Sequence, residues 1–141
     1  MLASGGRIVL STWGDGDPRW QFERDIRRGY LSEFDPALLE ELGRDLALLE
    51  RFDAPEKVEN ELRQGGFANI EMTQHEIEFV FADEQAWWDW NWSHAARVFL
   101  EPLSEEVRNR FRAEVAEAME QIRGESGFPR TYTALISLAD R

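Results

Sequence analysis

The amino-acid sequence predicts an α/β fold, which could be classed as α+β if the chain is a fragment, built from three strands and several helices. Ile8, Val9 and Leu10 are consecutive apolar residues, a pattern typical of a strand covered on both faces. Leucines recur at helical spacing between residues 38 and 49, directly after the helix-start signal Asp35-Pro36. The 141 residues suffice for one domain with its own core, and no boundary divides them.

The predicted order is strand, three helices, strand, two helices, strand, within a single domain of residues 1–141. Capping residues mark the helix starts at Asp17-Pro18 and Asp83, and Gly65-Gly66 marks a helix end. The predicted strands cover residues 7–13, 70–81 and 131–139. The predicted helices cover about residues 18–33, 36–50, 55–64, 84–100 and 105–123.

Composition and charge limit the partners. Asp and Glu number 28 against 16 Lys and Arg, giving a formal net charge of -12. Such a surface repels phosphate backbones and anionic lipids, so we expect neither a nucleic acid nor a membrane partner. The sequence has no cysteine, and the isolated His75 and His94 do not make a zinc site, so we expect no metal. With no membrane-length apolar run and no signal-peptide pattern, we expect a cytoplasmic protein.

Residues 4–13 read Ser-Gly-Gly-Arg-Ile-Val-Leu-Ser-Thr-Trp. They resemble the glycine turn and fifth strand of the class I S-adenosylmethionine-dependent methyltransferases, in particular the small-molecule, type 11-like branch, with Ser4 where proline is usual. Residues 55–67 end Leu-Arg-Gln-Gly-Gly-Phe and resemble the next helix, which commonly closes Leu-x-x-Ala-Gly-Phe; Gly65 replaces the alanine. The resemblance covers essentially the whole chain but only the second half of the family fold.

The resemblance implies a three-stranded mixed sheet that corresponds to strands 5-7-6 of a Rossmann-like methyltransferase, with covering helices. It implies the C-terminal, substrate-covering part of an enzyme that methylates a small molecule. The family cofactor is S-adenosylmethionine, but the cofactor-binding motifs of the first half are missing. The loop Gly14-Asp15-Gly16-Asp17 does not replace them, because its carboxylates and spacing do not match a G-x-G-x-x-G fingerprint. We therefore expect no cofactor to bind this chain alone and the chain alone to be inactive, which leaves open whether it is an enzyme.

Three candidate substrate-binding residues lie at the end of the first strand. Ser11, Thr12 and Trp13 stand at the carboxyl end of a parallel-type strand, where open α/β sheets place their ligands. We expect them at the edge of the active-site crevice.

Three more candidates lie on the predicted helix 84–100. Trp87, Asn91 and His94 form one strip that combines aromatic surface with polar groups, as a substrate pocket does. The alternative is that this tryptophan-rich helix simply packs in the core. His94 is also a weak candidate for a catalytic base, against the alternative of a half-buried, hydrogen-bonded histidine.

An unpaired interior strand has free backbone groups along its edge. The strand at residues 7–13 therefore predicts a homo-oligomer, most simply a homodimer, formed through this edge or by swapping elements. Two other functions remain open at this point. The chain could be a non-catalytic dimerisation or interaction module derived from a truncated methyltransferase, or an unrelated α+β domain whose aromatic pocket binds an apolar compound.

Overall fold

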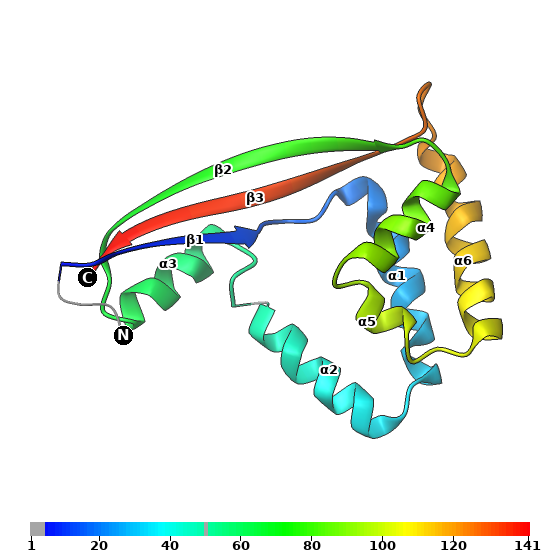
Figure 1. The fold of residues 1–141 in the computed structure, drawn as a ribbon, viewed down its shortest axis with the longest axis horizontal. Coiled ribbons are helices and arrows are strands. Elements are labelled where there is room, and N and C mark those ends of the chain that lie inside the picture. The colour runs from blue at the N-terminus through cyan, green and yellow to red at the C-terminus, as the bar shows by residue number, and fades with distance from the viewer. Residues whose placement is uncertain (1–4, 50) are drawn as a thin grey trace. The chain divides into compact units, whose positions relative to one another are not determined.

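Three strands and six α-helices form the part of the chain that the computed structural model describes, residues 5–49 and 51–141, with only the backbone for residues 45–49 (Figure 1). The strands are β1 (Arg7–Trp13), β2 (Ala68–Phe81) and β3 (Phe128–Asp140). The α-helices are α1 (Gln21–Gly29), α2 (Pro36–Leu49), α3 (Pro55–Gln64), α4 (Glu84–Ser93), α5 (Arg97–Leu100) and α6 (Glu105–Met119). Three 3-10 helices extend them: η1 (Pro18–Trp20), η2 (Tyr30–Glu33) and η3 (Glu120–Ile122). No described helix has the length and apolar character needed to cross a lipid bilayer.

The three strands form one sheet in the order β1-β3-β2, with β3 in the centre and running opposite to both neighbours (Figure 1). Arg7 lies opposite Asp140, and Trp13 lies opposite Ala134. The mixture of helices and three strands is confirmed. The sheet is antiparallel rather than mixed, because the central strand β3 runs opposite to both β1 and β2.

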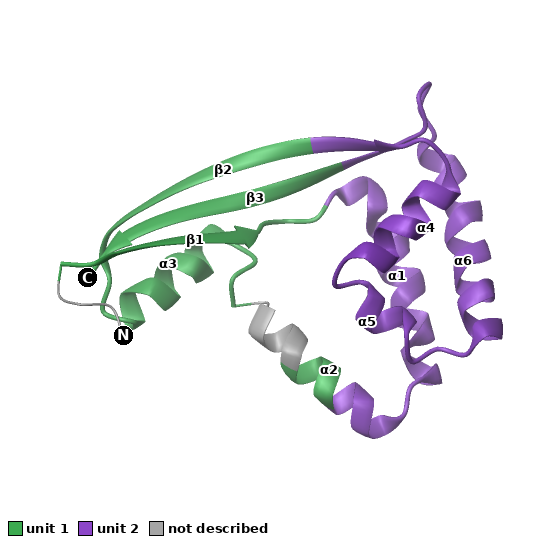
Figure 2. Ribbon diagram, viewed as in Figure 1, with its two compact units in different colours: residues 1–16, 41–77, 131–141 green, residues 17–40, 78–130 purple. Residues whose placement is uncertain are grey.

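The chain forms two compact units, each assembled from segments distant in sequence (Figure 2). Unit 1 comprises Met1–Gly16, Glu41–Ile77 and Thr131–Arg141. Unit 2 comprises Asp17–Glu40 and Glu78–Arg130. Unit 2 therefore consists of the segment that follows β1 and the segment that joins the end of β2 to the start of β3.

Unit 1 buries one face of its sheet against α3. Val58 and Leu62 of α3 form a buried cluster with Leu135 and Ala139 of β3. Partly buried side chains from the outer strands and neighbouring loops surround it: Ile8, Leu10, Phe52, Phe67, Ile70 and Met72. Burying these apolar groups supplies the main driving force for this unit.

Strand β1 lies at the border of the sheet, with its two faces in different environments. Ile8 and Leu10 face the α3 side, whereas Val9 is 62% exposed and Trp13 is 65% exposed. The expectation of a strand covered on both faces is wrong for the described residues. Successive side chains of a strand alternate between faces, so the middle residue of the apolar run points away from the core.

Unit 2 has a core of aromatic side chains. Trp20, Trp87 and Phe111 are fully buried, and the Tyr30 ring meets Phe111 edge-on with 5.4 Å between centroids. Such edge-to-face contacts add to the stabilisation from burial alone.

Several predicted elements differ in their limits. The helix predicted over residues 18–33 is divided into η1, α1 and η2, and the helix predicted over 105–123 continues as η3 after Met119. The helix predicted over 84–100 is interrupted, because His94 adopts an extended backbone after α4. Residue 50, the end of the helix predicted over 36–50, lies outside the described residues. Strand 7–13 and helix 55–64 are confirmed, and the other two strands extend beyond the predicted 70–81 and 131–139.

Candidate functional site

The three candidates on β1 belong to unit 1 and point in alternating directions. Trp13 and Ser11 are exposed, and the Trp13 ring contacts Tyr132 edge-on at 5.8 Å between centroids. Thr12 is half-buried, and its hydroxyl has no hydrogen-bond partner among the described residues. Ser11 and Trp13 thus face solvent on one side of β1, whereas the Thr12 hydroxyl is buried on the other side, so the three residues do not form one continuous surface.

The candidates on the tryptophan-rich segment separate into two environments in unit 2. Trp87 is fully buried and Asn91 is 2% exposed. The Asn91 side-chain amide donates to the Trp87 carbonyl oxygen at 2.9 Å, and its oxygen accepts from Arg27 at 3.2 Å. His94 follows the end of α4, is exposed, and packs against Trp90 with 4.8 Å between ring centroids. Because the helix ends at Ser93, the expected continuous strip is not formed.

A buried ion-pair network lies next to Asn91. The Glu23 carboxylate, on a residue that is 3% exposed, accepts from Arg27 at 2.8 Å and from Arg130 at 2.7 Å. The Arg27 guanidinium also lies 4.6 Å from the centroid of the Phe99 ring, close enough for a cation–π interaction. A buried carboxylate held by two guanidinium groups fixes the segments that carry them, so we assign this network a structural role.

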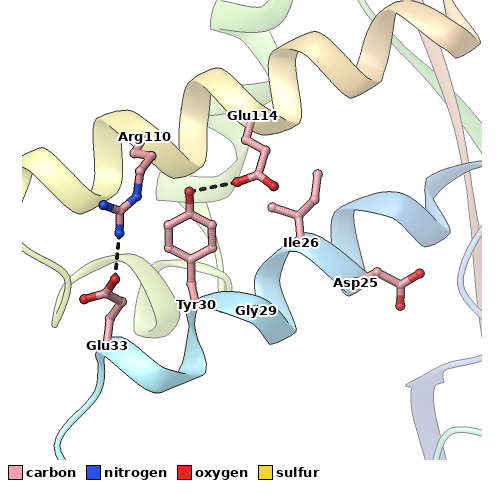
Figure 3. Close-up of a pocket in the computed structure, with 7 residues that line it drawn as sticks. All are labelled: Asp25, Ile26, Gly29, Tyr30, Glu33, Arg110 and Glu114. Carbon is pink, nitrogen blue, oxygen red and sulfur yellow. Dashed lines mark hydrogen bonds and ion pairs between the residues drawn. The ribbon is translucent and has the colours of Figure 1, made fainter.

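One cavity of unit 2 lies between α1, η2 and α6 (Figure 3), with a volume of about 540 Å³. Its wall from α1 and η2 consists of Asp25, Ile26, Gly29, Tyr30 and Glu33, and its wall from α6 consists of Arg110 and Glu114. The volume is within the range of small-molecule sites.

Tyr30 is the buried group of this cavity, at 7% exposed. Its hydroxyl donates to the Glu114 carboxylate at 2.8 Å (Figure 3). Burial, together with this hydrogen bond, raises the pKa of Tyr30. The phenol therefore stays protonated at neutral pH and acts as a hydrogen-bond donor rather than as a base.

Arg110 forms the second polar contact of the cavity. Its guanidinium pairs with Glu33 at 2.6 Å and lies 5.4 Å from the centroid of the Tyr30 ring. Hydrogen bonding to Tyr30, together with Glu33, raises the pKa of Arg110 above its ordinary value. Three carboxylates and one guanidinium line the cavity, so its field favours neutral polar or cationic molecules over anions.

Sequence reasoning did not identify this cavity. Arg110 and Glu114 are four residues apart on α6, which is the usual spacing of a solvent-exposed ion pair. Their actual partners, Glu33 and Tyr30, are about eighty residues away in the sequence. No local pattern signals that pairing.

The loop from Gly14 to Asp17 has structural roles that account for its glycine and its carboxylate. A Cβ atom placed on Gly14 would lie 3.0 Å from Cγ2 of Thr133, so this glycine is explained by the close approach of the central strand. Asp17 caps η1 by accepting from the Arg19 backbone N–H at 2.8 Å and also binds the Arg19 side chain. In this loop, Gly14 is thus used for packing and Asp17 for capping. Among the described residues, no group of three or more His, Cys, Asp or Glu could hold a metal ion.

No protein-family model matches the sequence, and no curated protein matches it either.

Proposed function

We propose that this chain is the C-terminal, acceptor-covering part of a class I S-adenosylmethionine-dependent methyltransferase that acts on a small molecule. The observation that carries the proposal is the strand order β1-β3-β2 with a reversed central strand. In the family, strands five, seven and six have this order and the seventh is antiparallel. The family resemblance of residues 4–13 and 55–67 assigns β1 to strand five, β2 to strand six and β3 to strand seven.

The composition of unit 2 supports the same proposal. Unit 2 consists of the segment after β1 and the segment after β2. In the family, insertions after strands five and six cover the cofactor site and shape the choice of acceptor. Unit 2 would accordingly provide the cover, and its Tyr30 cavity the acceptor site.

Methyl transfer from a sulfonium requires little side-chain chemistry, because the cofactor is already activated. The protein mainly aligns the acceptor and excludes water. Tyr30 would orient the acceptor by accepting a hydrogen bond at its hydroxyl oxygen, because its proton is donated to Glu114 and held there. Ser11, Thr12 and Trp13 stay candidates for the crevice edge, and His94 for a base. Trp87 and Asn91 would support the cover from within.

The cofactor itself would be held by residues that this sequence does not carry, since the loop after β1 does not fit it. We therefore propose that the chain alone neither binds S-adenosylmethionine nor transfers a methyl group, and we derive no catalytic step through the cofactor.

The test is to read the genomic sequence in frame upstream of the Met1 codon and to express the complete reading frame. We expect it to encode a strand followed by Asp/Glu-x-Gly-x-Gly, and the complete protein to transfer a labelled methyl group to a small-molecule acceptor. A Tyr30→Phe variant should raise KM for the acceptor. An immediate upstream stop codon, or a complete protein that does not bind S-adenosylmethionine, would refute the proposal.

A second candidate function rests on a separate observation, the unprotected edge of β1. A truncated relative of a methyltransferase that serves as a dimerisation or interaction module would use this edge for association. We propose it as the alternative if no cofactor-binding half accompanies the chain. In either case the protein would act in the cytoplasm.

A further inference from the structure

We propose that the outer edge of β1 pairs antiparallel with β1 of a second copy, giving a six-stranded sheet with a twofold axis at Leu10. The inference rests on the interaction-module candidate and specifies its partner and register. It does not require methyltransferase activity.

The two outer edges of the sheet differ in how they are protected. Along β2, the central part of the strand carries exposed charged or polar groups at Glu71, His75, Glu76 and Glu78. Charged side chains of this kind prevent an edge strand from recruiting another strand. Along β1, no charged residue, proline or glycine lies between Ile8 and Trp13. The β1 edge is therefore the one that can accept a strand.

The alternation of side chains limits the possible registers. Residues directly opposite each other in an antiparallel pair point to the same face, so a twofold axis must pass through a residue rather than between two. An axis at Leu10 is the register that pairs all seven residues of β1. It also keeps the α3-covered faces of both copies on the same side of the extended sheet.

The charges at the ends of β1 are complementary in this register. Arg7 stands at the start of the strand with its side chain 63% exposed, although it also pairs with Asp140 at 2.8 Å. Asp15 lies two residues beyond the end of the strand and is exposed. In the antiparallel pair, Arg7 lies opposite Trp13 of the second copy and diagonal to its Asp15, within reach of both. A parallel in-register pair would instead place like charges together at each end.

The pairing also closes on itself. Each copy contributes its single unprotected edge, so the dimer presents only the two charged β2 edges to solvent. Because this symmetric interface uses the unprotected β1 edge of both copies, association stops at the dimer and does not continue into a filament.

The test is the oligomeric state of the 141-residue chain, measured by sedimentation over a range of concentrations. We expect a monomer–dimer equilibrium. Asp15→Arg places two guanidinium groups together at each end of the pair and should weaken dimerisation about tenfold. The matched control is Glu125→Arg, which makes the same charge change in an exposed turn of unit 2 and should leave dimerisation unchanged.

A charge exchange tests the register. Arg7→Asp alone should also weaken dimerisation about tenfold, because the introduced carboxylate would face Asp15 of the second copy. An equimolar mixture of the Arg7→Asp and Asp15→Arg chains should restore a heterodimer. At one end the introduced carboxylate then faces the introduced guanidinium, and at the other end the native Arg7 faces the native Asp15. If Arg7→Asp does not fold, as judged by circular dichroism, hydrogen exchange of wild-type residues 7–13 decides instead. We expect their protection to rise with concentration.

Each contrary result overturns the proposal. These results are a monomer at every concentration, a dimer that Asp15→Arg weakens no more than Glu125→Arg does, or β1 amides whose protection is independent of concentration. None of them bears on cofactor binding by the complete reading frame, so failure of this proposal and failure of the methyltransferase proposal are distinguishable.

Discussion

Tyr30 and Trp87 are both buried aromatic residues with a polar atom, and they differ in how that atom is satisfied. The Tyr30 hydroxyl donates to Glu114, whereas Nε1 of Trp87 has no hydrogen-bond partner among the described residues. A buried donor without an acceptor costs stability, while a paired one contributes modestly. Substitutions at such residues therefore measure how much a paired and an unpaired buried polar atom each contribute to the stability of unit 2.

The raised pKa of Tyr30 predicts a loss of stability in alkali. A group whose pKa is higher in the folded state contributes its full stabilisation below the unfolded pKa of about 10, and this contribution is lost as the pH rises through the folded pKa. Tyr30→Phe should be about 1 kcal/mol less stable than wild type at neutral pH. It should also lack this part of the alkaline decline. Urea unfolding at a series of pH values measures both effects, and identical pH profiles for the two proteins would contradict the prediction.

Two tryptophan replacements form a matched pair. Nε1 of Trp20 donates to the Pro129 carbonyl oxygen at 2.9 Å, whereas Nε1 of Trp87 has no such partner in the described part of the chain. Both residues are fully buried. Trp20→Phe should therefore lower the free energy of unfolding by about 1 kcal/mol more than Trp87→Phe, because it removes a hydrogen bond to the partly buried Pro129 carbonyl. Equal losses in denaturant titrations would show that the hydrogen bond of Trp20 has no net effect.

At the scale of elements, the glycines of the chain have unequal roles. Gly127 has a φ of 126°, and a Cβ atom there would lie 2.1 Å from the Phe81 carbonyl oxygen. Gly43 lies within α2, with open space around the position of a Cβ atom. The first glycine is required by the close approach of two backbones, and the second is not.

Substituting these two glycines should change stability in opposite directions. Gly127→Ala should destabilise the protein by more than about 2 kcal/mol, because both the backbone angle and the contact with Phe81 exclude a side chain. Gly43→Ala should stabilise it by about 0.5–1 kcal/mol, because alanine loses less backbone entropy in a helix. Thermal unfolding of the two variants measures this difference. A Gly127→Ala protein as stable as wild type would refute the assigned role.

Most elements could be predicted from the sequence, because their signals are local. Asp83 and Ser104 are helix caps in the structure as in the sequence pattern, accepting from Ala86 and Val107 respectively. The interruption after α4 could not be predicted, since no glycine or proline lies between residues 84 and 100. The exposure of Val9 was also missed, because an apolar run does not reveal how many faces of a sheet are covered. The Tyr30 cavity requires contacts between α6 and a segment about eighty residues earlier, which no periodicity encodes.

At the scale of the whole molecule, the division into two units could not be predicted from the sequence. A contiguous domain ends in a linker, but unit 2 is made of two insertions and has no linker of its own. Most of its boundaries instead fall inside helix α2 and strands β2 and β3, where no turn or linker signal marks them.

The absence of cofactor-binding motifs gives a prediction for the whole chain. Titration of the 141-residue protein with S-adenosylmethionine in a calorimeter should give no heat of binding, because the loop after β1 is used for packing and capping. Saturable heat that S-adenosylhomocysteine competes away would show that the chain forms a cofactor site of its own.

The aromatic core of unit 2 also affects how this protein could diverge. Phe34 meets Phe99 edge-on at 5.3 Å, and Tyr30 meets Phe111 at 5.4 Å, so each insertion supplies one partner of each pair. Transplanting either insertion alone into a relative would expose half of every such pair to water. An engineered chimaera that keeps unit 2 folded should therefore transfer the two segments together.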